Sequence, residues 1–199
     1  PCESETNPIS ITRLLSETLE TLRPKFSHRS VDISAHIEKT LPVTISEDAF
    51  RKIMEGLTRN AVENTPDEGK IEISLVNSDD FVEFSVRDYG TGITDEDRQR
   101  IFEGFYPTRE TMQYSPKRPF DFNAGGKGAD LLRIRIFSER YGFKILMESS
   151  RCAFIPRNND ICPGKISRCV FCRNKEDCYN AGGTEFKLLF PVRTYAPGT

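Results

Sequence analysis

The sequence lacks several features that identify common classes of protein. No apolar run approaches the roughly 20 residues that a membrane-spanning helix needs, and no signal peptide stands at the beginning of the chain. The 28 basic and 30 acidic side chains give a net charge of -2, so binding of nucleic acid through bulk positive charge is not expected. The sequence therefore predicts a chain with no nucleic-acid partner and no membrane contact of its own.

Cysteine is also scarce, and its placement carries more information than its number. Of the six cysteines, Cys2 stands alone. The other five fall within 27 consecutive residues: Cys152, Cys162, Cys169, Cys172 and Cys178. A disulfide framework joins distant parts of a chain, whereas this clustering around a C-x2-C core indicates a metal site in a reducing compartment. We therefore expect a cytoplasmic protein.

The length fits one ordinary domain with a hydrophobic core. The chain has 199 residues, of which 37% are hydrophobic, and this is enough for a single domain with at most a small appendage. Because the chain begins at Pro1 rather than Met, we expect it to be a segment of a longer protein.

Apolar periodicity predicts alternating helices and strands. Helical spacing predicts helices over 10–23, 46–65 and 129–141, and a short helix from Thr94 to near Phe102. Apolar alternation and short apolar runs predict strands over 31–37, 71–76, 82–87, 143–148 and 183–191. Residues 105–126 have little periodicity and no apolar face, and a loop of that length inside a compact domain is typical of a mobile lid.

Two features of the sequence fit a bound nucleotide. Asn60 lies on a predicted helix, and its neutral carboxamide is a suitable ligand for Mg²⁺ beside a triphosphate. Asp88 ends a predicted strand, where its carboxylate can accept a hydrogen bond from the exocyclic amine of adenine and so select adenine over guanine. Gly90 and Gly92 follow, and they allow the backbone to turn tightly and approach the base without a Cβ. Taken alone, Asn60 and Asp88 are more readily explained as a helix-end cap and a turn residue.

A third feature is the glycine-rich stretch that leads into the helix predicted from residue 129. The free N–H groups and the positive dipole end of that helix suit phosphate anions at Gly126-Lys127-Gly128, and Lys127 adds a point charge. A glycine-rich turn is by itself weak evidence for a phosphate site. The order and spacing of the three features make their combination specific.

Together these features resemble the nucleotide-binding catalytic domain of sensor histidine kinases, within the ATPase superfamily that also holds gyrase B, the Hsp90 chaperones and MutL. Residues 53–66 resemble the N box of that family, 88–93 the G1 box, 101–106 the F box, 125–128 the G2 box and 182–186 the closing strand. The resemblance covers about residues 10–191, apart from the cysteine-rich stretch.

The resemblance implies a fold, a ligand and a reaction. The fold is a two-layer α/β (α+β) sandwich, whose mixed and mostly antiparallel sheet is covered by helices on one face. The ligands are ATP or ADP with Mg²⁺, and the reaction transfers the γ-phosphoryl group of ATP, with Asn60, Arg109 and Lys127 as catalytic residues. The implied nucleotide-binding residues are Asn60, which also binds Mg²⁺, Asp88, Gly90, Gly92, Ile93, Phe102, Gly126, Lys127, Gly128 and Thr184.

The phosphoacceptor histidine is expected outside this chain. The only histidines are His28, in a predicted loop, and His36, on the polar face of a predicted strand. The family carries its acceptor on a separate helical hairpin. The resemblance therefore implies an upstream dimerisation and phosphoacceptor domain, a response regulator as the next acceptor, and a homodimer formed only by the full-length protein.

Several positions depart from the family pattern. Gly56 replaces the first Asn of the N box, and Glu63 and Asn64 stand where a Lys and an aromatic residue are common. Asp130 replaces the third glycine of the G2 box, where a carboxylate near the phosphates is electrostatically unfavourable. A catalytically degenerate, nucleotide-binding regulatory module is therefore an alternative function.

Residues 151–181, here called the cysteine insert, add a second kind of candidate site. Four predicted ligands lie within 17 residues: Cys162, Cys169, Cys172 and Cys178. Two thiolates on one tight turn can reach a single ion at about 2.3 Å, so structural zinc is the first prediction and an iron-sulfur cluster the second, with Cys152 as a further candidate ligand. Thiols without a metal remain the third alternative. A metal- or redox-responsive interaction domain is therefore the other rival function, with the insert acting as a staple, a sensor or a docking surface.

Overall fold

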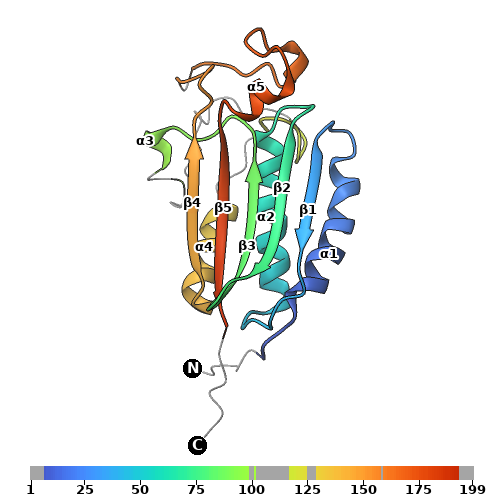
Figure 1. Cartoon of the computed structure of the whole chain (residues 1–199), viewed down its shortest axis with the longest axis vertical. Helices are drawn as coiled ribbons and strands as arrows, with labels where there is room; N and C mark the ends of the chain where they lie inside the picture. The colour runs from blue at the N-terminus through green and yellow to red at the C-terminus, as the bar shows by residue number, and fades with distance from the viewer. Residues whose placement is uncertain (1–6, 99–100, 102–116, 125–128, 158, 193–199) are drawn as a thin grey trace, which may run out of the picture.

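The computed structural model describes residues 7–98, 101, 117–124, 129–157 and 159–192, and it has two layers (Figure 1). One layer is a five-stranded sheet with the strand order β1-β2-β3-β5-β4. The strands are β1 Asp32–Ile37, β2 Lys70–Asn77, β3 Phe81–Asp88, β4 Lys144–Ser150 and β5 Gly183–Pro191. β1 and β2 pair in parallel, and the other three pairs of neighbours are antiparallel. The predicted mixed, mostly antiparallel sheet is confirmed.

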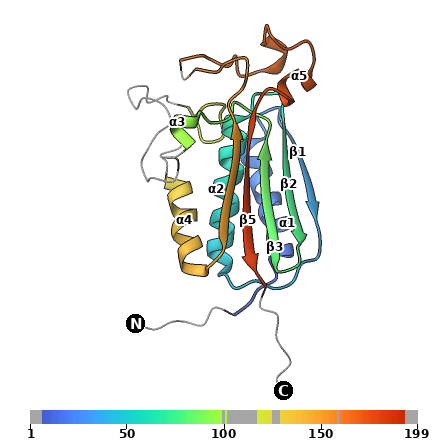
Figure 2. The same cartoon turned by 60° about the vertical axis from the view of Figure 1, so that its left-hand side comes forward.

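The second layer consists of helices that cover one face of the sheet (Figure 2). These helices are α1 Ile11–Leu22, which continues into the 3-10 helix η1 Arg23–Phe26, α2 Glu47–Asn64 and α4 Ala129–Tyr141. The sequence predicted all three long helices with bounds that agree within a residue. The two-layer α/β sandwich is therefore confirmed.

Local sequence explains where the central helix α2 begins and ends. The Ser46 side chain accepts a hydrogen bond from the Ala49 N–H at 3.2 Å, and Glu47 and Asp48 place negative charge in the first turn. Thr65 ends the helix in an extended conformation, as expected for the residue before a proline.

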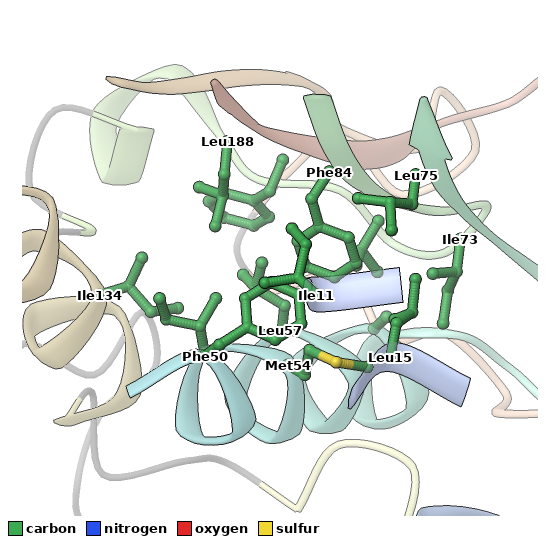
Figure 3. Packing of buried hydrophobic residues seen from close by; sticks show 14 of the residues in the cluster. Ile11, Leu15, Phe50, Met54, Leu57, Ile73, Leu75, Phe84, Ile134 and Leu188 are labelled. Atoms are coloured by element: carbon green, nitrogen blue, oxygen red, sulfur yellow. The ribbon is translucent and has the colours of Figure 1, made fainter. Parts of the chain in front are cut away.

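The hydrophobic core lies between the two layers (Figure 3). The fully buried ring of Phe50 on α2 lies 5.7 Å from the Phe84 ring of β3 and 6.1 Å from the Phe190 ring of β5. Ile11 and Leu15 of α1 fill the space beside them. This packing fixes α2 beneath β3, and so it places the C-terminal end of the helix near the end of the strand that carries Asp88.

Two predicted elements differ from the structure in detail. The predicted alternation in 31–37 is mostly confirmed, because Ile33 is buried and Val31 and Ile37 pack against the core, but Ala35 is exposed on this edge strand. The helix predicted from Thr94 is α3 Asp95–Arg98, and Phe102 lies outside the described residues. The cysteine insert contains η2 Ile166–Arg168 and α5 Lys175–Tyr179, which were not predicted because neither has a periodic apolar face.

Part of the predicted lid is packed against the domain. The Phe120 side chain is buried, and its ring lies 5.7 Å from that of Phe26. The prediction that residues 105–126 lack a packed face is therefore wrong for 117–124, because one aromatic residue anchors an otherwise polar stretch. Residues 105–116, 125 and 126 lie outside the described residues.

Within the described residues, no helix combines the length and the apolar character that crossing a membrane requires.

Candidate functional site

Asp88 is the last residue of β3, and its carboxyl group is buried at the end of the sheet. The residue is 6% exposed, and its carboxyl group accepts hydrogen bonds from the backbone N–H groups of Gly90, at 3.1 Å, and Thr184 of β5. Burial raises the pKa of Asp88 to about 7, although the two N–H donors and the charge of Arg87 act in the opposite direction. The backbone thus holds Asp88 as a hydrogen-bond acceptor in a desolvated position.

The glycine loop, residues 89–92, is clamped between two other segments. A Cβ on Gly90 would overlap the carbonyl oxygen of Asn64 at the end of α2. Gly92 has φ +62°, and a Cβ there would overlap the carbonyl oxygen of Ser150 at the end of β4. The Thr91 N–H also donates to the Asn64 carbonyl at 3.1 Å. The sequence predicted that Gly90 and Gly92 allow the backbone to approach the nucleotide base. The backbone carbonyls of Asn64 and Ser150 already lie so close that both positions require glycine.

Ser149 of β4 joins two of the predicted nucleotide-binding residues. Its hydroxyl oxygen accepts a hydrogen bond from the Ile93 N–H at 2.9 Å and lies 3.0 Å from the Thr184 hydroxyl oxygen. Ile93 and Thr184 are therefore brought together next to Asp88. Sequence analysis missed Ser149, because a serine just after the predicted strand over 143–148 has no signal that distinguishes it from a surface residue.

Asn60 lies on the last full turn of α2, half-buried, and its carbonyl oxygen accepts a hydrogen bond from the Asn64 side chain at 2.8 Å. Its carboxamide is a neutral, hard oxygen donor of the kind that Mg²⁺ takes alongside phosphate oxygens and waters. The residue therefore fits the predicted role as a Mg²⁺ ligand on chemical grounds.

Two departures from the family pattern compensate for one another. Asp130, in the first turn of α4, packs so close to Gly56 that a Cβ on this glycine would lie 3.2 Å from the Asp130 Cβ. The Asp130 carboxylate pairs with Arg59 and with Arg133, each at 3.1 Å. The small residue at 56 makes room for the larger one at 130, and two guanidinium groups offset the carboxylate charge that was expected to disfavour phosphates.

Glu63 has a structural partner in the described part of the predicted lid. The side chain is 5% exposed, and its Oε1 accepts a hydrogen bond from the Phe120 N–H at 3.0 Å. The Glu63 carbonyl accepts a second one from the Asn123 N–H at 2.7 Å. Burial raises the pKa of Glu63 above its usual range. This residue therefore holds 117–124 against α2.

Arg29 supports the same region and was missed by sequence analysis. Its side chain is 4% exposed and pairs with Asp67 at 2.8 Å. The guanidinium also donates to the carbonyls of Val62, Thr65 and Phe120 at 2.7–3.0 Å. An arginine in a polar stretch carries no sequence signal for burial, so this anchor appears only in the folded chain.

The remaining predicted residues of the nucleotide site lie outside the described residues. They are Phe102, Arg109, Gly126, Lys127 and Gly128.

The cysteine insert connects β4 to β5 at the end of the sheet where β3 terminates (Figure 1). Its five cysteines line one cavity of about 220 Å³, here called the thiol cavity.

Cys172 shares hydrogen bonds with Cys169 and Cys178, and desolvation raises the pKa of Cys172 to about 12 and that of Cys178 to about 11. Across the described part of the chain, no three His, Cys, Asp or Glu side chains are arranged to hold a metal ion. The structure thus gathers the predicted cysteines around one cavity without placing them in a coordination geometry.

The fold and the residues around Asp88 define a class: an α/β sandwich with the features of an ATP-binding domain. The family described as "Histidine kinase-, DNA gyrase B-, and HSP90-like ATPase" matches residues 45–194, and the chain belongs to this family. The resemblance inferred from the sequence motifs is confirmed at this level.

Curated relatives of the chain are sensor kinases. The adaptive-response sensory kinase SasA of Synechocystis sp. is 35% identical over 108 residues, which are 53% of this chain and 28% of that protein. The aerobic respiration control sensor protein ArcB homolog of Haemophilus influenzae is 30% identical over 115 residues, 57% of this chain and 35% of that protein. The chain thus matches only about a third, or less, of the length of these relatives.

Solved structures show the same fold. The mycobacterial sensor histidine kinase MprB has a TM-score of 0.61 at 16% identity, with 94% of this chain and 97% of that chain covered. The catalytic domain of histidine kinase ThkA has a TM-score of 0.61 at 19% identity, with 93% and 94% covered. The full-length ShkA in complex with AMPPNP has a TM-score of 0.62 at 21% identity, with 96% and 32% covered. The predicted fold of the histidine kinase catalytic domain is therefore confirmed.

Proposed function

We propose that this chain is the catalytic part of a sensor histidine kinase, which transfers the γ-phosphoryl group of ATP to a histidine on an upstream dimerisation domain. The observation that carries the proposal is Asp88, a buried carboxyl group whose orientation is set by two backbone N–H donors. Such a group can accept the exocyclic amine of adenine, and guanine offers a carbonyl at the same position. Asp88 therefore supplies base recognition, and the glycine loop keeps it in place.

The phosphate end of the nucleotide is assigned to residues around the C-terminal half of α2 and the start of α4. Asn60 would hold Mg²⁺, which neutralises charge on the phosphates during transfer. Gly126, Lys127 and Gly128 remain the proposed phosphate contacts, and Arg109 and Lys127 the proposed catalytic cations. The pairing of Asp130 with Arg59 and Arg133 supports this assignment, because it removes the main electrostatic objection to phosphate binding nearby.

The proposed partners follow from the reaction. The phosphoryl group would pass from the upstream histidine to an aspartate of a response regulator, and dimerisation would belong to the full-length protein. We place the chain in the cytoplasm, where ATP is available and cysteine thiols remain reduced. We propose no nucleic-acid partner and no membrane contact for this part of the protein.

Calorimetric titration with Mg-ADP tests the proposal. Asp88→Asn should weaken ADP binding by about 1–3 kcal/mol, because the buried acceptor loses its charge and one of its acceptor positions. Asp79→Asn, in the exposed turn between β2 and β3, is the matched control and should bind like the wild type. Absence of binding at millimolar ADP would contradict both the kinase and the nucleotide-binding regulatory module, and would favour the metal- or redox-responsive interaction domain instead.

A second candidate function is favoured by the thiol cavity. We propose that Cys162, Cys169, Cys172 and Cys178 bind zinc, with Cys152 as a further ligand candidate and an iron-sulfur cluster as the alternative occupant. The grouping of all five around one cavity supports the proposal, although the sulfur atoms must move to reach coordination distance. A metal- or redox-responsive role would then operate beside the nucleotide site rather than in place of it.

A further inference from the structure

The thiol cavity is lined by side chains whose character suits a soft metal ion. Apart from the cysteines its walls are mainly apolar, including Pro66, Phe154 and Ile155. The charged residues that line it are Lys165 and Arg168. Four thiolates around Zn²⁺ leave a net charge of about -2 from simple valence, and two cations at the wall are of the right sign and number to offset that charge, although Lys165 also pairs with Glu68 at 3.3 Å.

Metal binding in this cavity would require movement of the cysteine insert. Zinc holds sulfur at about 2.3 Å in tetrahedral geometry, whereas the described cysteines surround a cavity of about 220 Å³ and are not yet arranged for coordination. Cys172 is already hydrogen-bonded to both Cys169 and Cys178, so three of the sulfur atoms lie next to one another. The insert has a small core to oppose this movement: α5 buries no residue, Val170 is 88% exposed, and in the described part of the insert the buried residues are Ile155 and Ile166.

One set of hydrogen bonds connects the cysteine insert to the glycine loop beside Asp88. The backbone N–H of Cys152, a cavity residue, donates to the Thr91 carbonyl at 2.9 Å. The neighbouring Arg151 side chain donates to the Ile155 carbonyl at 2.8 Å on the insert side and to the Gly92 carbonyl at 3.4 Å on the loop side. Arg151 therefore bridges the insert and the loop that follows Asp88.

A second set reaches the same loop through the end of α2. The backbone carbonyl of Asp67 accepts a hydrogen bond from the Ile166 N–H at 3.1 Å. The backbone N–H of Asp67 donates one to the Gly164 carbonyl at 2.9 Å. Ile166 lines the thiol cavity, as does Pro66, the neighbour of Asp67. The Asn64 carbonyl, three residues before Asp67, accepts from Thr91. Both sides of the glycine loop are thus hydrogen-bonded to segments that contribute a residue to the lining of the thiol cavity, Cys152 on one side and Pro66 on the other.

We propose that the thiol cavity binds Zn²⁺ and that this binding strengthens nucleotide binding by ordering the glycine loop around Asp88. A loop already held in its binding conformation loses less conformational freedom when the nucleotide arrives. Because the coupling is reciprocal, nucleotide also strengthens zinc binding by the same factor. The claim that zinc strengthens nucleotide binding rests on the proposed function. The claim that zinc binds rests only on the residues that line the cavity.

The test compares the 199-residue chain after chelation under reducing conditions with the same chain reloaded with one equivalent of Zn²⁺. Excess Mg²⁺ keeps zinc away from the nucleotide. Native mass spectrometry should find one zinc per chain, and Cys169→Ser should abolish zinc binding.

Zinc should tighten ADP binding at least about fivefold, the lower end of typical coupling between sites. Arg151→Gln should still bind zinc but show less than a twofold change in ADP affinity, whereas the exposed Arg173→Gln should behave like the wild type.

The outcomes separate the two halves of the inference. Absence of bound zinc, or a purified chain that carries iron and sulfide in its place, overturns the zinc site. Zinc binding with unchanged ADP affinity overturns the coupling. Failure to bind ADP in either state contradicts the proposed function, and the coupling is then decided by hydrogen exchange. Zinc should slow exchange of the Thr91 and Ile93 amides, and unchanged exchange overturns the inference.

Discussion

The α/β sandwich and the cysteine insert are stabilised in different ways. In the sandwich, Phe50, Phe84 and Phe190 are fully buried in one core between sheet and helices. In the insert, Val170 and Phe171 are 88% and 57% exposed. Its described part buries two residues, Ile155 and Ile166, and hydrogen bonds join it to the glycine loop and to Asp67. The comparison shows that apolar burial holds the scaffold together, whereas the insert depends more on hydrogen bonds to neighbouring segments.

The largest contrast is expected from removing one aromatic ring in each region. Phe84→Ala should lower the free energy of unfolding by about 3–5 kcal/mol, because it leaves a cavity in a core with no exposed face. Phe171→Ala removes a half-exposed ring that stacks on Phe154 at 5.5 Å and should cost less than about 1 kcal/mol. Urea unfolding of both variants measures the difference. Similar losses of stability would show that the insert has a core of its own.

A second contrast concerns polar anchors. Arg29→Ala should destabilise the protein by about 3 kcal/mol, because it removes the donor to three backbone carbonyls and the partner of Asp67. Arg135→Ala is the matched control, since Arg135 is 55% exposed and pairs with Glu139 at the surface, and it should stay within about 0.5 kcal/mol of the wild type. Equal effects of the two substitutions in urea unfolding would contradict the role given to Arg29.

The smallest of the three effects is the pH dependence that Asp88 adds to stability. Its pKa is raised from the ordinary value to about 7, so between about pH 4 and 7 the folded protein keeps a proton that the unfolded chain has lost. The free energy of unfolding should therefore fall by about 2 kcal/mol as the pH rises from 5 to 7, and level off above that.

Asp88→Asn isolates this contribution. Subtracting its unfolding free energies from those of the wild type removes the titration of other groups, including Glu63, whose raised pKa acts in the same direction. If the difference between the two proteins is independent of pH from 5 to 7, the Asp88 carboxyl group is not desolvated as described.

Much of the scaffold could be predicted from the sequence, because it follows from apolar spacing. The helix over 129–141 and the strand over 183–191 were predicted with the bounds that the structure shows. Asp88, Gly90 and Gly92 were recognisable because a fixed motif follows a strand of clear apolar character. Ala35 of the edge strand β1 was predicted on the buried face but is exposed, since burial depends on neighbours that sequence periodicity does not specify.

The supports of the site could not be predicted, because they depend on contacts between distant segments. Arg29 and Phe120 are separated by 91 positions in the sequence, and neither lies in a recognisable motif. Glu63 and Asp130 looked unfavourable as departures from the family pattern. In the structure Glu63 accepts a hydrogen bond from the Phe120 N–H, and Asp130 pairs with Arg59. The cysteines were conspicuous in the sequence, whereas their connection to the glycine loop through Arg151 required the structure.

The central claim is that Asp88 and the residues around it form the nucleotide site. An NMR titration of the isotopically labelled chain with Mg-ADP tests this claim directly, because it locates the bound nucleotide without assuming a site. The largest shifts of backbone amides should fall on Gly90, Gly92, Ile93 and Thr184, with a further change in the Asn60 side-chain amide, and they should be strongly reduced in Asp88→Asn. Shifts confined to the thiol cavity, or shifts that persist unchanged in Asp88→Asn, would contradict the claim.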